Sequence, residues 1–332
     1  MPNSGALYGE CALVSVVILN YNGLKYLKEG LSECLDSVLK TKYPNFEVIF
    51  VDNGSSDGSV AFVKANYGSA VKLVENKSNF GWSEGFNAGI IASKGAYIAL
   101  LSNDMHVDPD WLNPVLALMK SDPSVGLAGF KRMLHGKEGY LDGIGGDLYL
   151  CGRVKPIGTG ELDRGQYDEI KEDIDYIGGA MVLKREALLK TGLFDPGFFI
   201  FCEDIDLCYR FRKIGYKVVY VPNAVIYHRG QVTLKGRDPK GRYLEYMSYR
   251  SRVRCAVLHF TLQRLLSTMF IDGVSFVIAN VTTKRLLLQA YLWNLQNAAQ
   301  SLKLRLRCGP APLYSCKAPV LFLTVKPSGK RA

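Results

Sequence analysis

Polar side chains that can bind a metal ion follow an apolar run near residue 100. Residues 97–101 (Tyr-Ile-Ala-Leu-Leu) are typical of a strand buried on both faces, and Ser102, Asn103 and Asp104 come directly after it. His106 follows two residues later. Ligands of open α/β sheets bind beyond the carboxyl ends of the strands, so Asp104 and His106 can share a divalent cation that carries phosphate oxygens. A solvated loop with an Asx turn accounts for Asp104 alone equally well.

A second acidic group opens a predicted helix. An aromatic loop over residues 194–202 leads into Glu203, Asp204 and Asp206, and helical character follows. The dipole of a helix favours acids in its first turn, so a structural role is the alternative to a chemical one. This stretch is the second candidate for a functional site.

Strands and helices must alternate to position these groups. Strands are predicted at residues 13–19, 46–51, 71–75, 97–101 and 125–130, and helices at 24–39, 84–93 and 109–120. Alternation with short links predicts a doubly wound, mostly parallel, Rossmann-like α/β sheet. Residues 131–175 are predicted to be an irregular insertion that covers the site, and strands return at 176–183, 217–221 and 224–228.

The loops after the first two strands exclude some nucleotide sites. Neither residues 20–23 nor residues 52–59 fit a GxGxxG dinucleotide motif or a P-loop. Gly85 and Gly89 lie inside the predicted helix over 84–93, where each costs about 1 kcal/mol relative to Ala. Glycines are tolerated where a ligand or backbone comes close, so we expect this helix to line the site.

Charge divides the 332-residue chain into two parts. Through His228 there are 23 Lys and Arg against 28 Asp and Glu, a net charge of −5, and from Arg229 onward 18 against 3, a net charge of +15. A basic C-terminal part favours an anionic partner, either a lipid surface or nucleic acid. Its basic residues alternate with long aliphatic ones and lack an aromatic-interleaved pattern, so nucleic acid is not expected.

Cysteine usage and hydropathy indicate the compartment. The eight cysteines form no CxxC pair and no Cys/His zinc spacing, which favours reduced thiols in a cytoplasmic protein over a disulfide framework. The N-terminus lacks the basic and apolar regions of a signal peptide, and no run of 18 apolar residues occurs. We expect neither secretion nor a membrane span.

Seven segments in order between Val14 and His228 carry a family resemblance: VSVVILNYNG, EVIFVDNGSSDGS, NFGWSEGFNAGI, ALLSNDM, GGAMVLKREAL, FFIFCEDIDLCYRFRKIGYKV and VIYHRG. The chain resembles the family 2 inverting glycosyltransferases of GT-A fold, especially the rhamnosyltransferase-like branch of bacteria and archaea. The resemblance implies an enzyme of cell-envelope polysaccharide synthesis. It would move a hexose or deoxyhexose from a nucleotide-diphosphate sugar to a lipid-linked or growing glycan acceptor.

The resemblance also implies binding roles for individual residues. Positions that match donor-binding residues of the family are Asn20, Asn22 and Asp52 for the base and ribose, Asn79, Gly81 and Asn87 beside the nucleotide sugar, and Asn103 in the metal motif. Gly178 and Gly179 match a segment beside the acceptor pocket, where missing side chains leave room.

The metal is expected to be Mg²⁺ or Mn²⁺. Asp104 matches the final carboxylate of the family's DXD motif, although Ser102 and Asn103 stand where other members often carry Asp. His228 matches a histidine that completes the coordination in some relatives, with a core histidine as the alternative. His106 as a ligand rests on spacing alone.

Glu203 and Asp204 match the family motif whose aspartate is the general base. In-line displacement with inversion needs one carboxylate to take the acceptor hydroxyl proton, and a cation near Asp104 would stabilise the leaving diphosphate. Glu203 is the substitute base, and Asp206 is expected to serve the helix and its packing.

Three regions are predicted: a catalytic domain over residues 1–230, amphipathic helices over 231–307, and a basic, proline-containing tail over 308–332. The helices are expected to lie peripherally on the inner face of the cell membrane. The alternative is that they pack on the body or on another subunit in a homodimer. The other functions considered are a membrane-bound pseudoenzyme or scaffold and, less favoured, a nucleotidylyltransferase, whose Gly-rich basic loop is missing after the first strand.

Overall fold

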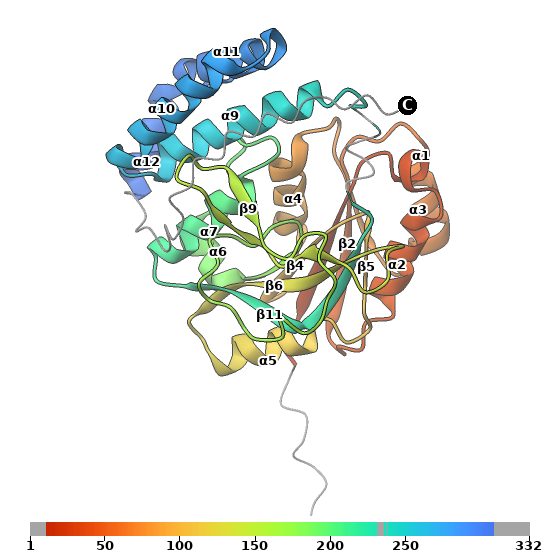
Figure 1. The fold of residues 1–332 in the computed structure, drawn as a ribbon. Coiled ribbons are helices and arrows are strands. Elements are labelled where there is room, and N and C mark those ends of the chain that lie inside the picture. The colour runs from red at the N-terminus through yellow and green to blue at the C-terminus, as the bar shows by residue number, and fades with distance from the viewer. Residues whose placement is uncertain (1–10, 231–235, 237, 309–332) are drawn as a thin grey trace, which may run out of the picture.

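The predicted strands assemble into one sheet in the computed structural model, which describes residues 11–230, 236 and 238–308 (Figure 1). The sheet order is β3 (Lys72–Glu75), β2 (Phe46–Asp52), β1 (Val14–Asn20), β4 (Tyr97–Ser102), β10 (Met181–Lys184), β6 (Val125–Leu134), β11 (Lys217–His228) and β5 (Met105–Val107). Only β10 and β5 along this path run antiparallel to their neighbours. The mostly parallel α/β fold predicted from the sequence is confirmed.

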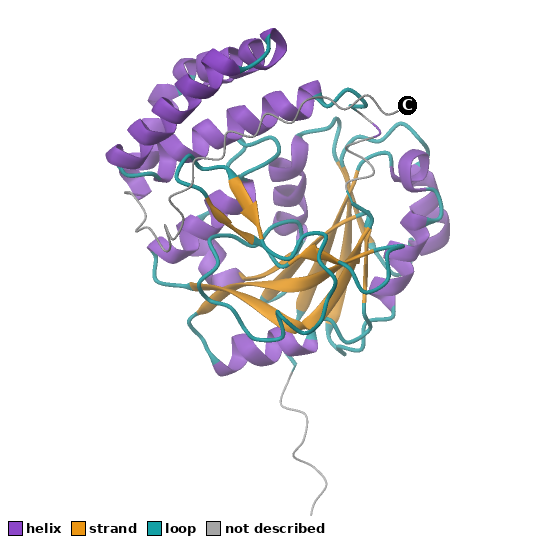
Figure 2. Cartoon of the chain, viewed as in Figure 1, coloured by secondary structure: helices purple, strands orange, loops and turns teal. Residues whose placement is uncertain are grey.

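Helices cover both faces of the sheet because its strands are apolar on both sides (Figure 2). Along β1, Val16 and Ile18 pack in one core cluster and Val17 packs in the other. The first cluster includes α2 (Gly30–Leu39) and α5 (Asn113–Ser121), and the second includes α4 (Gly81–Ala92) and α7 (Glu203–Lys213). The remaining helices of this part are α1 (Gly23–Leu27), α3 (Ser59–Tyr67) and α6 (Arg185–Thr191).

Three elements differ from the prediction. The helix predicted over 24–39 is split into α1 and α2 at Lys28, whose φ of 53° is left-handed, while the apolar periodicity continues across the break. The two strands predicted over 217–228 are the single strand β11, with an irregularity between Val221 and Val225. A strand is predicted over 176–183, but the observed strand β10 covers only Met181–Lys184.

The glycines of α4 serve packing against the sheet. A Cβ at Gly85 would lie 2.6 Å from Leu19 Cδ1, and one at Gly89 would lie 2.3 Å from Val17 Cγ1. The helix therefore lies closer to β1 than any side chain would permit. Only the first residues of α4, Gly81 and Trp82, line the cavity described below.

The insertion after β6 contains three short strands. β7 (Leu141–Gly143) pairs with β6, and β8 (Gly146–Leu148) forms a hairpin with β9 (Val154–Pro156). Val154, Pro156 and Thr159 line the cavity, so the insertion covers the site as predicted.

Four helices follow: α9 (Arg242–His259), α10 (Leu262–Ile278), α11 (Val281–Gln296) and α12 (Ala298–Cys308). α9 packs on the body, and α10 and α11 lie on its outer side (Figure 1). Among the described residues, no helix has the length and apolarity needed to span a membrane. The predicted tail lies, from residue 309 onward, outside the described residues.

Buried arginines join these helices to one another and to the body. Arg252 pairs with Asp272 of α10 at 2.6 Å, and Arg254 pairs with Asp195 at 2.7 Å. Arg264 donates to the carbonyl oxygen of Tyr149 at 3.0 Å. Part of the positive charge of the C-terminal region is therefore internal and does not face a partner.

Candidate active site

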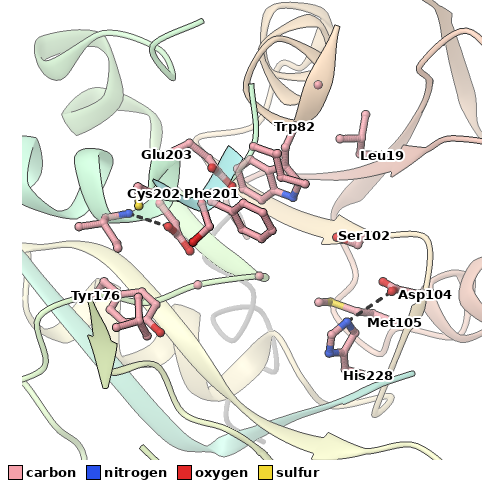
Figure 3. A pocket seen from close by; sticks show the side chains of 18 of the residues that line it. Leu19, Trp82, Ser102, Asp104, Met105, Tyr176, Phe201, Cys202, Glu203 and His228 are labelled. Atoms are coloured by element: carbon pink, nitrogen blue, oxygen red, sulfur yellow. Dashed lines mark hydrogen bonds and ion pairs between the residues drawn. The ribbon is translucent and has the colours of Figure 1, made fainter. Parts of the chain in front are cut away.

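A cavity of about 480 Å³ lies at the carboxyl ends of β1 and β4. Its lining comes from these strand ends, the start of α4, the β6–β7 region, residues 176–179, the aromatic loop and the start of α7. Asp104 and His228 lie on one side, and Glu203 with Cys202 lies on the other (Figure 3). The two acidic groups singled out in the sequence therefore face one cavity.

Asp104 is held against His228 by strand pairing. β5 pairs with β11 so that Met105 lies opposite His228, and the Arg229 amide donates to the Asp104 carbonyl oxygen at 3.0 Å. Asp104 Oδ2 lies 3.4 Å from His228 Nε2. Asp104 Oδ1 is buried and has no hydrogen-bond partner among the described residues.

Asp142 fixes the imidazole of His228 from behind. Its Oδ2 lies 3.0 Å from His228 Nδ1 and accepts from Arg132 Nε at 3.0 Å. Burial by itself lowers the pKa of His228, but the hydrogen bonds to Asp104 and Asp142 raise that pKa to about 9. Burial by itself raises the pKa of Asp142, but His228 and Arg132 hold it at about 2. Asp142 is therefore anionic and orients the ring.

These residues fit a divalent cation. An unpaired, buried carboxylate oxygen lies beside an imidazole nitrogen, and a second carboxylate holds the other ring nitrogen. This carboxylate–histidine arrangement is the usual support of a metal-binding imidazole. A cation here would take the place of the proton on His228 Nε2, with Asp104 as its carboxylate ligand.

Asp204 and Glu203 begin α7 after a strained turn. Phe201 and Cys202 have φ values of 69° and 63°, which few residues other than glycine adopt. Asp204 Oδ1 accepts from the amide of Ile205 at 2.8 Å. A Cβ at Gly178 would lie 2.4 Å from Asp204 Oδ2, so the glycine leaves room for the carboxylate itself.

The pKa values of both acids are raised, with different causes beside burial. Burial raises the pKa of Asp204 to about 6. Burial and the charge of Asp204 raise the pKa of Glu203 well above its usual value, and Glu203 Oε2 has no hydrogen-bond partner within the described chain. Burial therefore favours the protonated form of both acids, and at Glu203 the neighbouring charge of Asp204 adds to this effect.

Nine of the residues predicted for the site line the cavity: Asn79, Gly81, Asn103, Asp104, Gly178, Gly179, Glu203, Asp204 and His228. Four others lie outside its lining: Asn20, Asn22, Asp52 and Asn87. Asp206 is buried and pairs with Arg210 and His259, in keeping with the packing role expected for it.

Asn20, Asn22 and Asp52 form a network beneath the cavity. Asn20 donates to Asp52 Oδ1 at 2.9 Å and accepts from Asn103 Nδ2 at 2.7 Å. Asn22 Oδ1 accepts from the Ser56 amide at 2.8 Å. The network fixes Asn103 beside Asp104 and joins the loops after β1 and β2.

Two further residues lie elsewhere. Asn87 makes hydrogen bonds of 2.9 and 3.0 Å to the backbone of Phe194, which tie α4 to the aromatic loop. His106 stacks on Tyr227 with ring centroids 4.6 Å apart and does not line the cavity. The metal-sharing arrangement with Asp104 predicted from spacing is therefore not formed, because β5 pairs with β11 at the sheet edge.

Arg132, Asp142 and Tyr176 line the cavity but were missed in the sequence. Arg132 bonds to Asp142 and to the carbonyl oxygen of Gly178, so it links the metal side to the loop beside Asp204. Tyr176 stands two residues before the segment GGAMVLKREAL, which was the available signal for it. No motif surrounds Arg132 or Asp142, because tertiary contacts alone bring them to the site. Asp142 is one of several acids in the insertion, so its residue type did not single it out.

Comparisons with known proteins identify the family of the chain and its fold. The family described as "Glycosyl transferase family 2" matches residues 15–191. An uncharacterized protein of Sinorhizobium fredii is 30% identical over 72% of this chain, and glycosyltransferase GlyG of Streptococcus pneumoniae is 25% identical over 65%. The matched part is 27% of the first relative's length and 71% of the second's.

A solved structure shares the fold. The crystal structure of GalNAc-T7 with UDP, GalNAc and Mn²⁺ has a TM-score of 0.60 and 19% sequence identity, over 88% of this chain and 57% of that chain. This likeness confirms the predicted GT-A architecture of the sheet.

Proposed function

The chain belongs to glycosyl transferase family 2, and we propose that it is an inverting enzyme that moves one sugar from a nucleotide-diphosphate donor to a lipid-linked or growing glycan acceptor. The observation that carries the proposal is the cavity that places Asp104 and His228 opposite Asp204. One side suits a diphosphate and its cation, and the other suits an acceptor hydroxyl.

Asp104 and His228 would hold Mg²⁺ or Mn²⁺. The unpaired oxygen of Asp104 supports this assignment, as does the Mn²⁺ in the GalNAc-T7 structure. When bound, such an ion supplies positive charge that stabilises the departing nucleoside diphosphate. Asp142 keeps His228 oriented toward that position through its bond to Nδ1.

Asp204 is proposed as the general base. Its carboxylate would take the proton of the acceptor hydroxyl as that oxygen attacks the anomeric carbon, and the bond to the diphosphate breaks on the opposite face. Inversion at this carbon needs no second catalytic carboxylate. Burial and the charge of Asp204 raise the pKa of Glu203 and so disfavour its carboxylate form, which is why it is not the preferred base.

The donor is proposed to lie along the ends of β1, β2 and β4. Asn79, Gly81 and Asn103 line the cavity there, and Asn20, Asn22, Asp52 and Asn87 support their positions. A hexose or deoxyhexose donor, as in the rhamnosyltransferase-like branch, is the proposed substrate class. Gly178 and Gly179 are proposed to border the acceptor.

The C-terminal helices are proposed to contact the inner face of the cell membrane, where a lipid-linked acceptor for cell-envelope polysaccharide would lie. Large apolar side chains of α10 and α11 are exposed, including Phe270 at 71% and Leu295 at 73%. Exposed apolar helix faces with nearby basic residues such as Arg285 suit an interfacial position. A homodimer through the same faces is the alternative.

Donor turnover tests the enzymatic proposal. The purified chain is incubated with Mg²⁺ or Mn²⁺ and UDP-, dTDP- or GDP-sugars, with and without membrane lipid extract, and released nucleoside diphosphate is measured. Asp204→Asn and Asp104→Asn should abolish release, whereas the exposed Asp110→Asn should not. Nucleotide binding without release by any donor and acceptor would favour a pseudoenzyme. A parallel incubation with nucleoside triphosphates and sugar 1-phosphates, in which pyrophosphate is the leaving group, tests the nucleotidylyltransferase alternative.

A further inference from the structure

A second group of metal-binding side chains lies outside the catalytic cavity. Glu33 of α2, His106 of β5 and His135, which follows β6, each offer a ligand atom, and these atoms lie within 4.8 Å of one another. Their elements are far apart in the sequence and meet at the edge of the sheet. None of the three residues lines the catalytic cavity.

The histidines are held in place by aromatic packing. The ring of His106 stacks on Tyr227 at 4.6 Å and meets the ring of His135 edge-on, with centroids 4.9 Å apart. The His135 amide donates to the His228 carbonyl oxygen at 2.9 Å. The imidazoles therefore converge without help from a bound ligand.

One nitrogen of this group is unsatisfied. His106 Nδ1 is buried and has no hydrogen-bond partner among the described residues. A buried polar atom without a partner is costly, and a ligand that binds it removes the cost. Glu33 pairs with Arg229 through Oε2, and its second oxygen allows a carboxylate to bind an ion as well.

We propose that Glu33, His106 and His135 form a second metal site, for a borderline divalent transition metal ion such as Zn²⁺. Two imidazoles and one carboxylate, with water in the remaining position, are a ligand set that Zn²⁺ accepts, whereas Mg²⁺ prefers oxygen ligands. The site is independent of the proposed glycosyl transfer.

The bound ion would tie three segments that support the catalytic cavity. β5 is a three-residue edge strand that directly follows Asp104, and its partner β11 ends at His228. An ion joining β5 to α2 and to the end of β6 would stabilise this edge. We therefore expect the ion to raise the melting temperature of the chain.

Metal competition tests the site. The full chain is titrated with Zn²⁺ in excess Mg²⁺ against a chromophoric chelator. We expect one tightly bound Zn²⁺ per chain, an affinity lower by about tenfold or more in His135→Gln and Glu33→Gln, and unchanged affinity in Asp104→Asn and in Asp36→Asn on the same helix. Loss in Asp104→Asn with retention in His135→Gln would place the ion in the catalytic cavity and overturn the proposal.

Two readouts separate binding from folding and from cysteine ligation. His135→Gln should melt at the wild-type temperature without metal and should lose the rise that Zn²⁺ produces. Co²⁺ bound at the site should show ligand-field bands without a thiolate charge-transfer band. A thiolate band that persists in His135→Gln would assign the ion to a cysteine, and absence of Zn²⁺ binding by the wild-type chain would refute the site.

Discussion

At the scale of single residues, the proposed site depends on two adjacent acids in different surroundings. Glu203 and Asp204 share the start of α7, but Glu203 is the more buried of the two and lacks a partner for Oε2 among the described residues. Two neighbouring carboxylates cannot both ionise cheaply in a buried place, and the one with more contact to polar groups ionises more readily. This difference is the reason for proposing Asp204 as the base.

Asp204→Asn should therefore lower kcat by about 10²- to 10⁴-fold, the usual contribution of a general base. Glu203→Gln keeps the size of the side chain and removes its titratable proton, and it should keep kcat within about tenfold of the wild type. Steady-state kinetics with a defined donor measures both variants. A larger loss in Glu203→Gln than in Asp204→Asn would reverse the assignment.

The pH profile follows from the pKa of about 6 to which burial raises Asp204. A base must be unprotonated to accept a proton, so kcat/KM should be low below pH 6, rise through it and level off above it. The control is Glu203→Gln, which removes a coupled acid and should keep the rising limb but shift its midpoint. A profile that is flat from acidic to neutral pH would contradict Asp204 as the base.

A substitution of Asp142 tests the proposed metal position at Asp104 and His228. Because it orients His228 without touching the ion position, Asp142→Asn should weaken activation by Mn²⁺ about 10- to 100-fold and leave kcat largely restored at saturating Mn²⁺. Titration of activity against Mn²⁺ separates these effects. Asp147→Asn in the same insertion is the control, and a lowered kcat with unchanged Mn²⁺ affinity would contradict the positioning role.

At the scale of elements, most strands and helices could be predicted from the sequence because their patterns are local. The runs over β1, β2 and β4 are largely apolar, and the acids and amides at their carboxyl ends stand at the edge where sites of such sheets lie. The break at Lys28 was not predictable, since Leu24, Leu27 and Leu31 keep helical spacing across it. The site positions of Arg132 and Asp142 could not be predicted, because the antiparallel return of the insertion brings these residues together and no local pattern encodes it.

The contact between α9 and α10 allows the contribution of helix packing to the free energy of unfolding to be measured. Asp272→Ala leaves Arg252, which is 5% exposed, without its carboxylate, and loss of one partner of a buried ion pair costs about 3–5 kcal/mol. The exposed pair of Glu186 and Lys190 is the matched control, and Glu186→Gln should leave the free energy of unfolding nearly unchanged. Urea unfolding gives both values. Equal costs would mean that the C-terminal helices do not contribute to the stability of the body.

At the scale of the whole molecule, charge and apolar surface are separated. Arg252, Arg254 and Arg264 are each 5% exposed or less, so part of the basic character of the C-terminal part is used inside the protein. The outer faces of α10 and α11 instead carry exposed Leu266, Phe270 and Leu288, at 57%, 71% and 52%. The proposed membrane binding through these faces should therefore depend more on apolar contact than on charge.

The corresponding prediction is that the chain binds anionic vesicles and that salt weakens this binding only modestly. Full burial of a Leu or Phe side chain contributes about 1.5–3 kcal/mol, so Leu266→Asp combined with Phe270→Asp should lower vesicle affinity by more than about tenfold. Leu189→Asp on α6 of the body, at a side chain 78% exposed, is the control and should bind like the wild type.

Vesicle sedimentation at low and high salt, beside size-exclusion chromatography, distinguishes the two candidate partners of α10 and α11. A membrane interface requires loss of vesicle binding in the double variant with no change in oligomeric state. A wild-type dimer that the double variant converts to a monomer, without vesicle binding by either, would instead assign these faces to a second copy. If salt strongly weakened vesicle binding, exposed basic residues would contribute to it, as the charge of the sequence suggested. Salt screens exposed charges and acts only weakly on buried pairs such as Arg254 with Asp195.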